Sequence, residues 1–149
     1  MSSKSITRSI TTIEKHGKLI LRDEIKPYGL NLAEGLVLVS FFNNERDSIT
    51  QDKLIDELHF DKGVLTRTMQ SLENQGYLKR QSNPNDKRSF IFSITEKSKN
   101  LINTLSPVIE KWQKVLLAGL DTNDITLLQN LLEKMAKNTL DKANQRGLK

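Results

Sequence analysis

The most constraining feature of the sequence is an abrupt change of hydrophobic period at Gly76. Before this glycine, two short stretches, 51–58 and 61–75, carry apolar residues at helical spacing. Thr50 and Asp61 stand in front of them, and their side-chain oxygens suit the N-cap position of a helix. Gly76 suits the left-handed position that follows a helix. Two short helices joined by a tight turn predict a helix-turn-helix.

After Gly76 the composition is typical of β-strands. Residues 77–81 and 88–94 have strand character, and the stretch between them, 82–86, consists of turn-forming residues (Ser-Asn-Pro-Asn-Asp). We therefore predict a β-hairpin with a long loop directly behind the second helix.

The second helix has two chemically different faces. At about 100° per residue, one narrow arc collects the residues that we predict to be buried: Leu65, Thr68, Met69 and Leu72. The opposite side is rich in hydrogen-bond donors and can enter a DNA major groove: Lys62, Gly63, Thr66, Arg67 and Gln70. A glycine here costs about 1 kcal/mol relative to alanine. Close approach to a phosphate or base would explain Gly63, and so would an unconstrained surface position.

The charge distribution agrees with this interpretation. The chain carries a net charge of +5. Residues 31–58 hold two basic and six acidic side chains, a balance of −4, whereas residues 59–89 hold six basic and three acidic ones, a balance of +3. The basic excess therefore coincides with the second helix and the hairpin, as nucleic-acid binding requires. An ordinary solvated surface is the alternative for each charge taken singly.

Helices are predicted on both sides of this segment. Apolar residues recur at steps of three and four over 5–25, and Pro27 ends that pattern. Asn31 predicts a capped helix through about residue 42, because Glu34 follows it three residues later.

Two more helices are predicted after the hairpin. Thr95 can cap a helix from 96 to about 117, which Pro107 must kink or split in two. The last helix runs from about Thr122 to Asn144 and should bury one apolar face: Ile125, Leu128, Leu131, Leu132 and Met135. The predicted fold is mainly α with a small β-hairpin wing, as a single domain over 1–149.

Several classes of protein are disfavoured by what the sequence lacks. There is no cysteine, so disulfides and thiolate metal sites are excluded, and only two histidines occur, His16 and His59. No nucleotide-binding loop, nucleophile motif or zinc motif is present, so we expect neither an enzyme nor a bound cofactor or metal. Neither a signal peptide nor a membrane span is apparent, so we expect a cytoplasmic protein that does not bind membranes.

The segment from Gln51 to Lys97 resembles the MarR (multiple antibiotic resistance regulator) family of winged helix-turn-helix regulators. The matching stretches are TQDKLIDEL, DKGVLTRTMQSLENQGYLKR and NPNDKRSFIFSITEK. The family's wing carries Asp-x-Arg followed by strand residues and Leu-Thr, which here correspond to Asp86-Lys87-Arg88 and Ile94-Thr95. The order of predicted elements extends the resemblance over nearly the whole chain.

The resemblance implies roles in binding double-stranded DNA. Residues 61–75 become the recognition helix, and Arg88 in the wing reaches the minor groove or its phosphates. Asp86 would hold the Arg88 side chain by a charge-assisted hydrogen bond, although a solvent-exposed ion pair is the simpler alternative. The full expected DNA-binding set is Gln51, Lys62, Gly63, Thr66, Arg67, Gln70, Lys87 and Arg88.

The resemblance also implies a homodimer. It assigns residues 31–95 to a DNA-binding lobe and residues 1–30 and 96–149 to a helical dimerisation lobe. Ile6, Ile10 and Ile13 are the expected interface, with intramolecular packing as the alternative.

Family members respond to small aromatic or phenolic effectors, so we expect a pocket near four aromatic side chains. These are His16, Tyr28, Phe42 and Trp112, each of which could instead be a core or interface residue. The absence of cysteine argues against the thiol-switched branch of the family.

The predicted function is a sequence-specific DNA-binding transcriptional regulator, with repression as the family's commoner mode. It would bind a pseudo-palindromic operator as a homodimer. The alternative is a winged-helix protein that coats chromosomes without sequence specificity or that contacts other proteins. A protein-contacting version would need an apolar patch on the exposed side of the helix 61–75.

Overall fold

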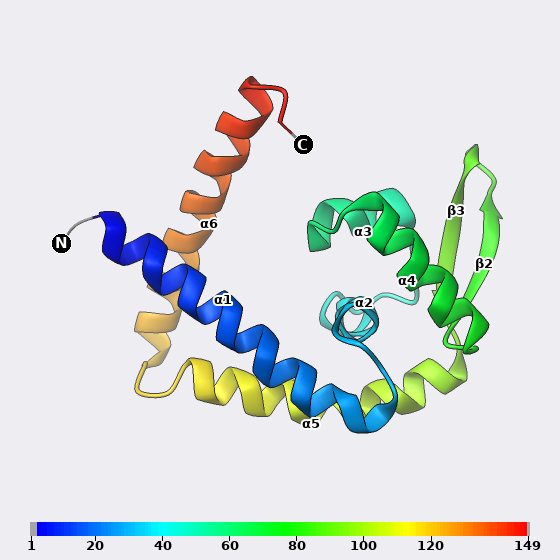
Figure 1. Cartoon of the computed structure of the whole chain (residues 1–149), viewed down its shortest axis with the longest axis horizontal. Helices are drawn as coiled ribbons and strands as arrows, with labels where there is room; N and C mark the ends of the chain where they lie inside the picture. The colour runs from blue at the N-terminus through cyan, green and yellow to red at the C-terminus, as the bar shows by residue number, and fades with distance from the viewer. Residues whose placement is uncertain (1–2, 149) are drawn as a thin grey trace. The chain divides into compact units, whose positions relative to one another are not determined.

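The computed structural model describes residues 3–148, which form helices and one small antiparallel sheet (Figure 1). The elements are α1 (Ser3–Ile25), the 3-10 helix η1 (Lys26–Tyr28), α2 (Leu32–Asn43), β1 (Ser48–Thr50), α3 (Gln51–Leu58), α4 (Lys62–Asn74), β2 (Leu78–Asn83), β3 (Asp86–Ile94), α5 (Glu96–Leu116) and α6 (Thr122–Gln145). The mainly helical class with a β wing is therefore confirmed.

The chain packs as two compact units, Met1–Trp112 and Gln113–Lys149. The first contains the predicted helix-turn-helix, the sheet, α1 and most of α5, and the second contains α6. The predicted DNA-binding and dimerisation lobes stay a prediction, because they describe an assembly of two chains.

The helix boundaries follow from side-chain caps that the sequence predicted. Asn31 and Glu34 form a reciprocal capping box, each side chain accepting from the other's backbone N–H at 2.9 Å. Thr50 Oγ1 accepts from Lys53 N at 3.4 Å at the start of α3. Gly76 adopts φ 78° after α4, and the next backbone N–H donates to the carbonyl of Leu72 at 2.9 Å, which closes the last turn.

The sheet differs from the predicted hairpin in two respects. Its order is β1-β3-β2, so it has a third strand that was not predicted, since three residues are too short to show alternation. The long loop predicted over 82–86 is wrong, because Asn83 and Asp86 pair in the ladder and only two residues connect the strands. Asn83 Oδ1 accepts from Asn85 N at 3.0 Å, and this local turn lets the strands continue to the tip.

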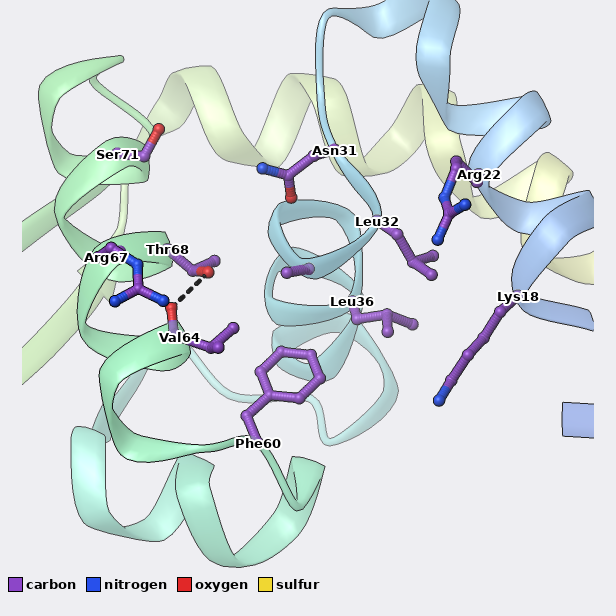
Figure 2. Close-up of a pocket in the computed structure, with 11 residues that line it drawn as sticks. Lys18, Arg22, Asn31, Leu32, Leu36, Phe60, Val64, Arg67, Thr68 and Ser71 are labelled. Atoms are coloured by element: carbon purple, nitrogen blue, oxygen red, sulfur yellow. Dashed lines mark hydrogen bonds between the residues drawn. The ribbon is translucent and has the colours of Figure 1, made fainter. Parts of the chain in front are cut away.

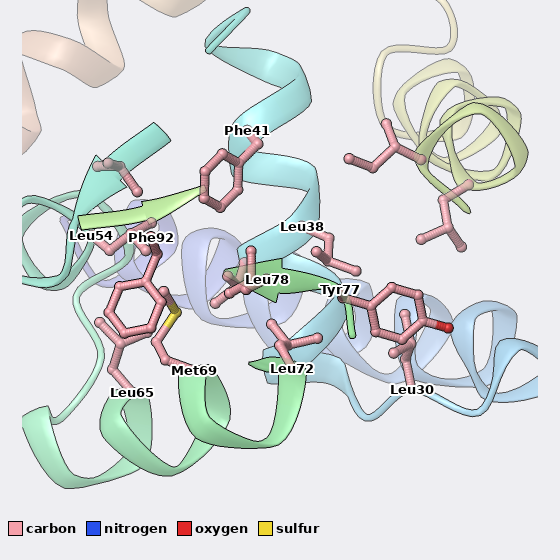
Figure 3. Close-up of a cluster of buried hydrophobic side chains, with 14 of the residues drawn as sticks. Leu30, Leu38, Phe41, Leu54, Leu65, Met69, Leu72, Tyr77, Leu78 and Phe92 are labelled. Atoms are coloured by element: carbon pink, nitrogen blue, oxygen red, sulfur yellow. The ribbon is translucent and has the colours of Figure 1, made fainter. Parts of the chain in front are cut away.

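The hydrophobic core joins α4 to α2 and the sheet. The predicted inward face of α4 is buried: Leu65, Thr68, Met69 and Leu72. Figure 3 shows these leucines and the methionine among Leu38 and Phe41 of α2, Leu54 of α3, and Leu78 and Phe92 of the strands. The core therefore fixes which side of α4 remains for contact with other molecules.

A buried carboxylate also connects α2 with α4. Glu34 is only 4% exposed. Besides its role in the capping box, its Oε1 accepts hydrogen bonds from Ser71 Oγ at 2.7 Å and Gln75 Nε2 at 3.1 Å. These bonds satisfy the buried oxygen and tie the start of α2 to the last turns of α4.

An ion pair attaches α3 to the segment in front of β1. Arg46 Nη1 and Nη2 lie 2.8 and 2.6 Å from the two carboxylate oxygens of Glu57. Hydrogen bonding from Arg46 holds the pKa of the Glu57 carboxyl below its ordinary value. A carboxyl whose pKa is lower in the folded state stabilises the fold above its unfolded pKa, and this contribution is lost as pH falls through the folded pKa.

The last two helices depart from the sequence predictions. Pro107 lies inside one continuous helix, so it does not split α5. Ser106 Oγ donates to the carbonyl of Asn103 at 3.4 Å, the group to which a proline cannot donate. The burial predicted for the last helix is wrong for a single chain, where Ile125 is half-buried and the other four are exposed: Leu128, Leu131, Leu132 and Met135.

Over residues 3–148, no helix is both long and apolar enough to cross a membrane. Within the same range, no group of three or more histidine, aspartate or glutamate side chains is arranged to hold a metal ion.

Candidate DNA-binding surface

The outward face of α4 carries the polar side chains that the sequence singled out. Lys62, Thr66, Arg67 and Gln70 are all exposed, and the last three lie on the side of the helix away from its buried residues. Val64, next to these residues on α4, is also 38% exposed. This single valine does not make an apolar patch of the kind that a protein-contacting helix would need.

The first residue of α3 is joined to this face. Gln51 Nε2 donates to Thr66 Oγ1 at 2.7 Å, and the Thr66 hydroxyl donates to the carbonyl of Lys62 at 2.8 Å. Thr66 is therefore already engaged in the protein and orients the Gln51 amide beside α4. Both residues were predicted to lie at the DNA, but nothing in the sequence indicated that one positions the other.

Gly63 has a local explanation. Asp61 Oδ1 caps α4 by accepting from the backbone N–H of Gly63 at 2.9 Å. A Cβ at Gly63 would lie 3.1 Å from that oxygen and 3.5 Å from Arg67 Nη1. The glycine thus leaves room for the cap, and the Arg67 guanidinium lies back toward the first turn of the helix.

The wing carries the Asp-x-Arg element at its tip. Asp86, Lys87 and Arg88 are all exposed. Asp86 Oδ1 accepts from the backbone N–H of Arg88 at 3.0 Å, whereas no ion pair joins their side chains within the described residues. The expected side-chain bond is therefore replaced by a bond to the main chain, which shapes the backbone from which Arg88 projects.

The four aromatic residues predicted to border a ligand pocket do not come together. His16 is exposed on α1, with Nδ1 3.0 Å from the carbonyl of Thr12. Tyr28 packs against the core, and Trp112 lies so close to Gly17 that a Cβ there would be 2.8 Å from its ring. Phe42 borders a separate hollow at the end of α2.

A pocket of about 620 Å³ lies instead between α1, α2 and α4 (Figure 2). Three cationic side chains contribute to its lining: Lys18, Arg22 and Arg67. Its apolar wall includes Leu32, Leu36, Phe60 and Val64. This pocket was not predicted, because its residues come from segments that only the packing of α1 and α4 against α2 brings together.

The predicted interface residues form an uncovered apolar row on α1. Ile6, Ile10 and Ile13 are 46%, 42% and 49% exposed. Their spacing of three and four residues places them on one side of the helix. A second copy of the chain could cover such a row.

A core-anchored helix with a polar outward face, followed by a two-stranded wing, defines a winged helix-turn-helix DNA-binding regulator of the MarR type. The chain belongs to the transcriptional regulator SarA/Rot family, whose sequence model matches residues 20–105. That family consists of transcriptional regulators rather than enzymes.

Individual relatives agree with this assignment. The HTH-type transcriptional regulator BilQ of Clostridioides difficile (strain CD3) is 29% identical over 129 residues, which are 86% of each chain. A MarR family transcriptional regulator from Listeria monocytogenes, crystallised with a 26mer DNA, is 28% identical with a TM-score of 0.87, covering 100% of this chain and 98% of its own. A MarR transcriptional regulator from Methanosarcina mazei Go1 is 29% identical with a TM-score of 0.81, covering 93% and 99%.

Proposed function

We propose that this DNA-binding regulator acts in the cytoplasm as a homodimeric repressor of a pseudo-palindromic operator. The observation that carries the proposal is the two-sided α4, whose apolar side is fixed in the core and whose polar side is exposed. Two such helices about one helical turn apart, on the order of 34 Å, would read an inverted repeat. A repressor of this kind blocks transcription by occupying the operator.

The DNA contacts divide into two groups. Arg67 and Gln70 contact base edges in the major groove, with Lys62 and Gly63 at the start of the helix and Gln51 held beside it by Thr66. In the wing, Lys87 and Arg88 contact the backbone or minor groove, and Asp86 shapes the main chain that presents them. Base contacts carry sequence information, whereas phosphate contacts mainly position the protein.

Selection of bound duplexes from a random pool tests the proposal. We expect an enriched inverted repeat whose half-sites lie about 10 base pairs apart. Enrichment of one half-site alone would contradict the dimer. If no sequence is enriched after selection, the protein binds DNA without sequence specificity, as a chromosome-coating protein would.

We further propose that a small aromatic anion enters the 620 Å³ pocket and releases the DNA. A lining that combines cationic with apolar groups suits a planar molecule with one carboxylate. Arg67 borders the pocket and also belongs to the polar face of α4. A bound anion that attracts this guanidinium would therefore compete with DNA for the same side chain.

Leu36→Trp should abolish the response to effector while leaving operator binding within about twofold of wild type, because the indole fills the pocket away from the polar face of α4. The measurement is operator release by sodium salicylate or benzoate, followed by fluorescence anisotropy. Tyr28→Trp, which introduces the same ring outside the pocket, is the control and should respond like wild type. If the Leu36→Trp protein still releases DNA, the effector does not bind in this pocket. If neither salicylate nor benzoate releases DNA from the wild-type protein, the effector is not an aromatic anion of this kind.

A further inference from the structure

One face of the wing carries an interaction that DNA binding alone does not explain. Arg80 of β2 pairs with Phe92 of β3, and Ser82 pairs with Phe90, so these side chains share a face of the hairpin. Phe92 is buried in the core that also holds Met69 and Leu72 of α4. The same face of the hairpin is therefore turned toward α4 at its base and continues outward to Phe90.

Arg80 contacts Phe90 on this face and Glu73 on α4. Its guanidinium carbon lies 4.7 Å from the centre of the Phe90 ring, and its Nε lies 3.5 Å from Glu73 Oε1 near the end of α4. The three residues thus form a chain from the helix to one strand of the wing and on to the other. We call Glu73, Arg80 and Phe90 the wing clamp.

Arg88 is two residues from Phe90 on the same strand, in the stretch where the register with β2 shifts between Ser82 and Asn83. Phe90 is 40% exposed, so one part of its ring is free to contact Arg80. The contact between Arg80 and the Phe90 ring holds β3, the strand from which Arg88 projects, against β2.

We propose that the wing clamp is a positioning device that sets Arg88 at a fixed distance from the outward face of α4. The two DNA-contacting elements must engage different grooves at the same time, so their relative placement decides whether both sets of contacts form. The inference rests on the proposed DNA contact of Arg88. None of the three clamp residues needs to touch DNA for the device to work.

A double-mutant cycle on the full-length protein tests the clamp, with a duplex selected from the random pool as the probe. Phe90→Leu should weaken binding about five- to thirtyfold, from one lost cation–π contact in each of two subunits. The dependence of affinity on salt should fall toward that of Arg88→Ala, although no charge is removed, because a displaced Arg88 no longer neutralises its phosphate. In an Arg88→Ala background the same substitution should change affinity less than about twofold, since nothing remains to be positioned.

Additive losses in the cycle would overturn the proposal and assign Phe90 to an independent contact. If the Arg88→Ala protein binds the duplex as tightly as wild type, Arg88 does not contact DNA and the clamp has nothing to position. This single variant therefore tests the proposed DNA contact separately from the cycle. Phe90→Trp, which retains a ring for Arg80, should restore binding. Thermal unfolding of each variant should show a folded protein at the assay temperature.

Glu73→Gln gives a second test, in which the clamp and simple electrostatic repulsion predict opposite changes in affinity. Removing a negative charge near DNA should tighten binding if electrostatic repulsion is its only effect, whereas loss of the clamp should weaken it. Lys79→Gln removes a charge on the other face of β2, outside the clamp, and should weaken binding together with a smaller salt dependence. Tighter binding by Glu73→Gln would overturn the proposal.

Discussion

Arg67→Ala is expected to lower affinity for the selected operator by roughly 30-fold to 10⁴-fold, while affinity for random duplex falls far less. A bidentate contact between arginine and a base is worth about 1–3 kcal/mol, and a dimer loses two of them. The Arg67 guanidinium lies back toward Gly63, in the first turn of α4. That end of a recognition helix is the part that meets base edges.

Anisotropy titrations with the operator and with a scrambled duplex at one salt concentration measure the effect. Arg67→Lys is the matched control, because it keeps the charge and removes the planar fork. It should retain affinity for the scrambled duplex and lose most of the preference for the operator. Equal losses of Arg67→Ala on both duplexes would instead place this side chain on the phosphate backbone.

Features set by neighbouring residues could be predicted from the sequence. The Asn31–Glu34 capping box, the Asp61 cap and the left-handed Gly76 each depend on groups within a few positions of one another. The buried face of α4 followed from helical periodicity alone. These local signals agree with the global fold, which is why residue spacing alone is enough to recognise the helix-turn-helix.

Features set by packing between distant segments could not be predicted. The strand β1 exists only because β3 offers it a pairing edge. The pocket needs α1 and α4 on either side of α2. Asp86 was expected to pair with the Arg88 side chain, but an aspartate in a tight turn finds a backbone N–H two residues away more readily.

The wing clamp illustrates the same limit. In the sequence, Arg80 is one basic residue among several in a basic segment, and Phe90 is one apolar residue of a strand. Only the register of β2 with β3, together with the end of α4, places Arg80 between Glu73 and Phe90. Its expected role therefore differs from that of its basic neighbours, although its charge is the same.

Ile10→Glu is expected to convert the proposed homodimer into monomers and to lower operator affinity by about 10²- to 10⁴-fold, the usual gain from joining two binding modules. Ile10 is the middle residue of the exposed row on α1, with Ile6 and Ile13 on either side. A carboxylate buried in an apolar interface without a partner is strongly unfavourable, and a two-fold interface would contain it twice. Each monomer would keep its own α4 and wing but could engage only one half-site.

Light scattering at micromolar concentration measures the mass, and anisotropy with the selected operator measures the affinity. Thr12→Glu is the matched control, because it adds the same charge to an exposed position of the same helix outside the Ile6, Ile10 and Ile13 row. It should remain dimeric and bind with an affinity close to that of wild type. Dimeric Ile10→Glu protein with full operator affinity would show that this row lies outside the interface. A wild-type monomer that protects a complete inverted repeat would contradict the homodimer itself, because one copy of α4 cannot occupy two half-sites.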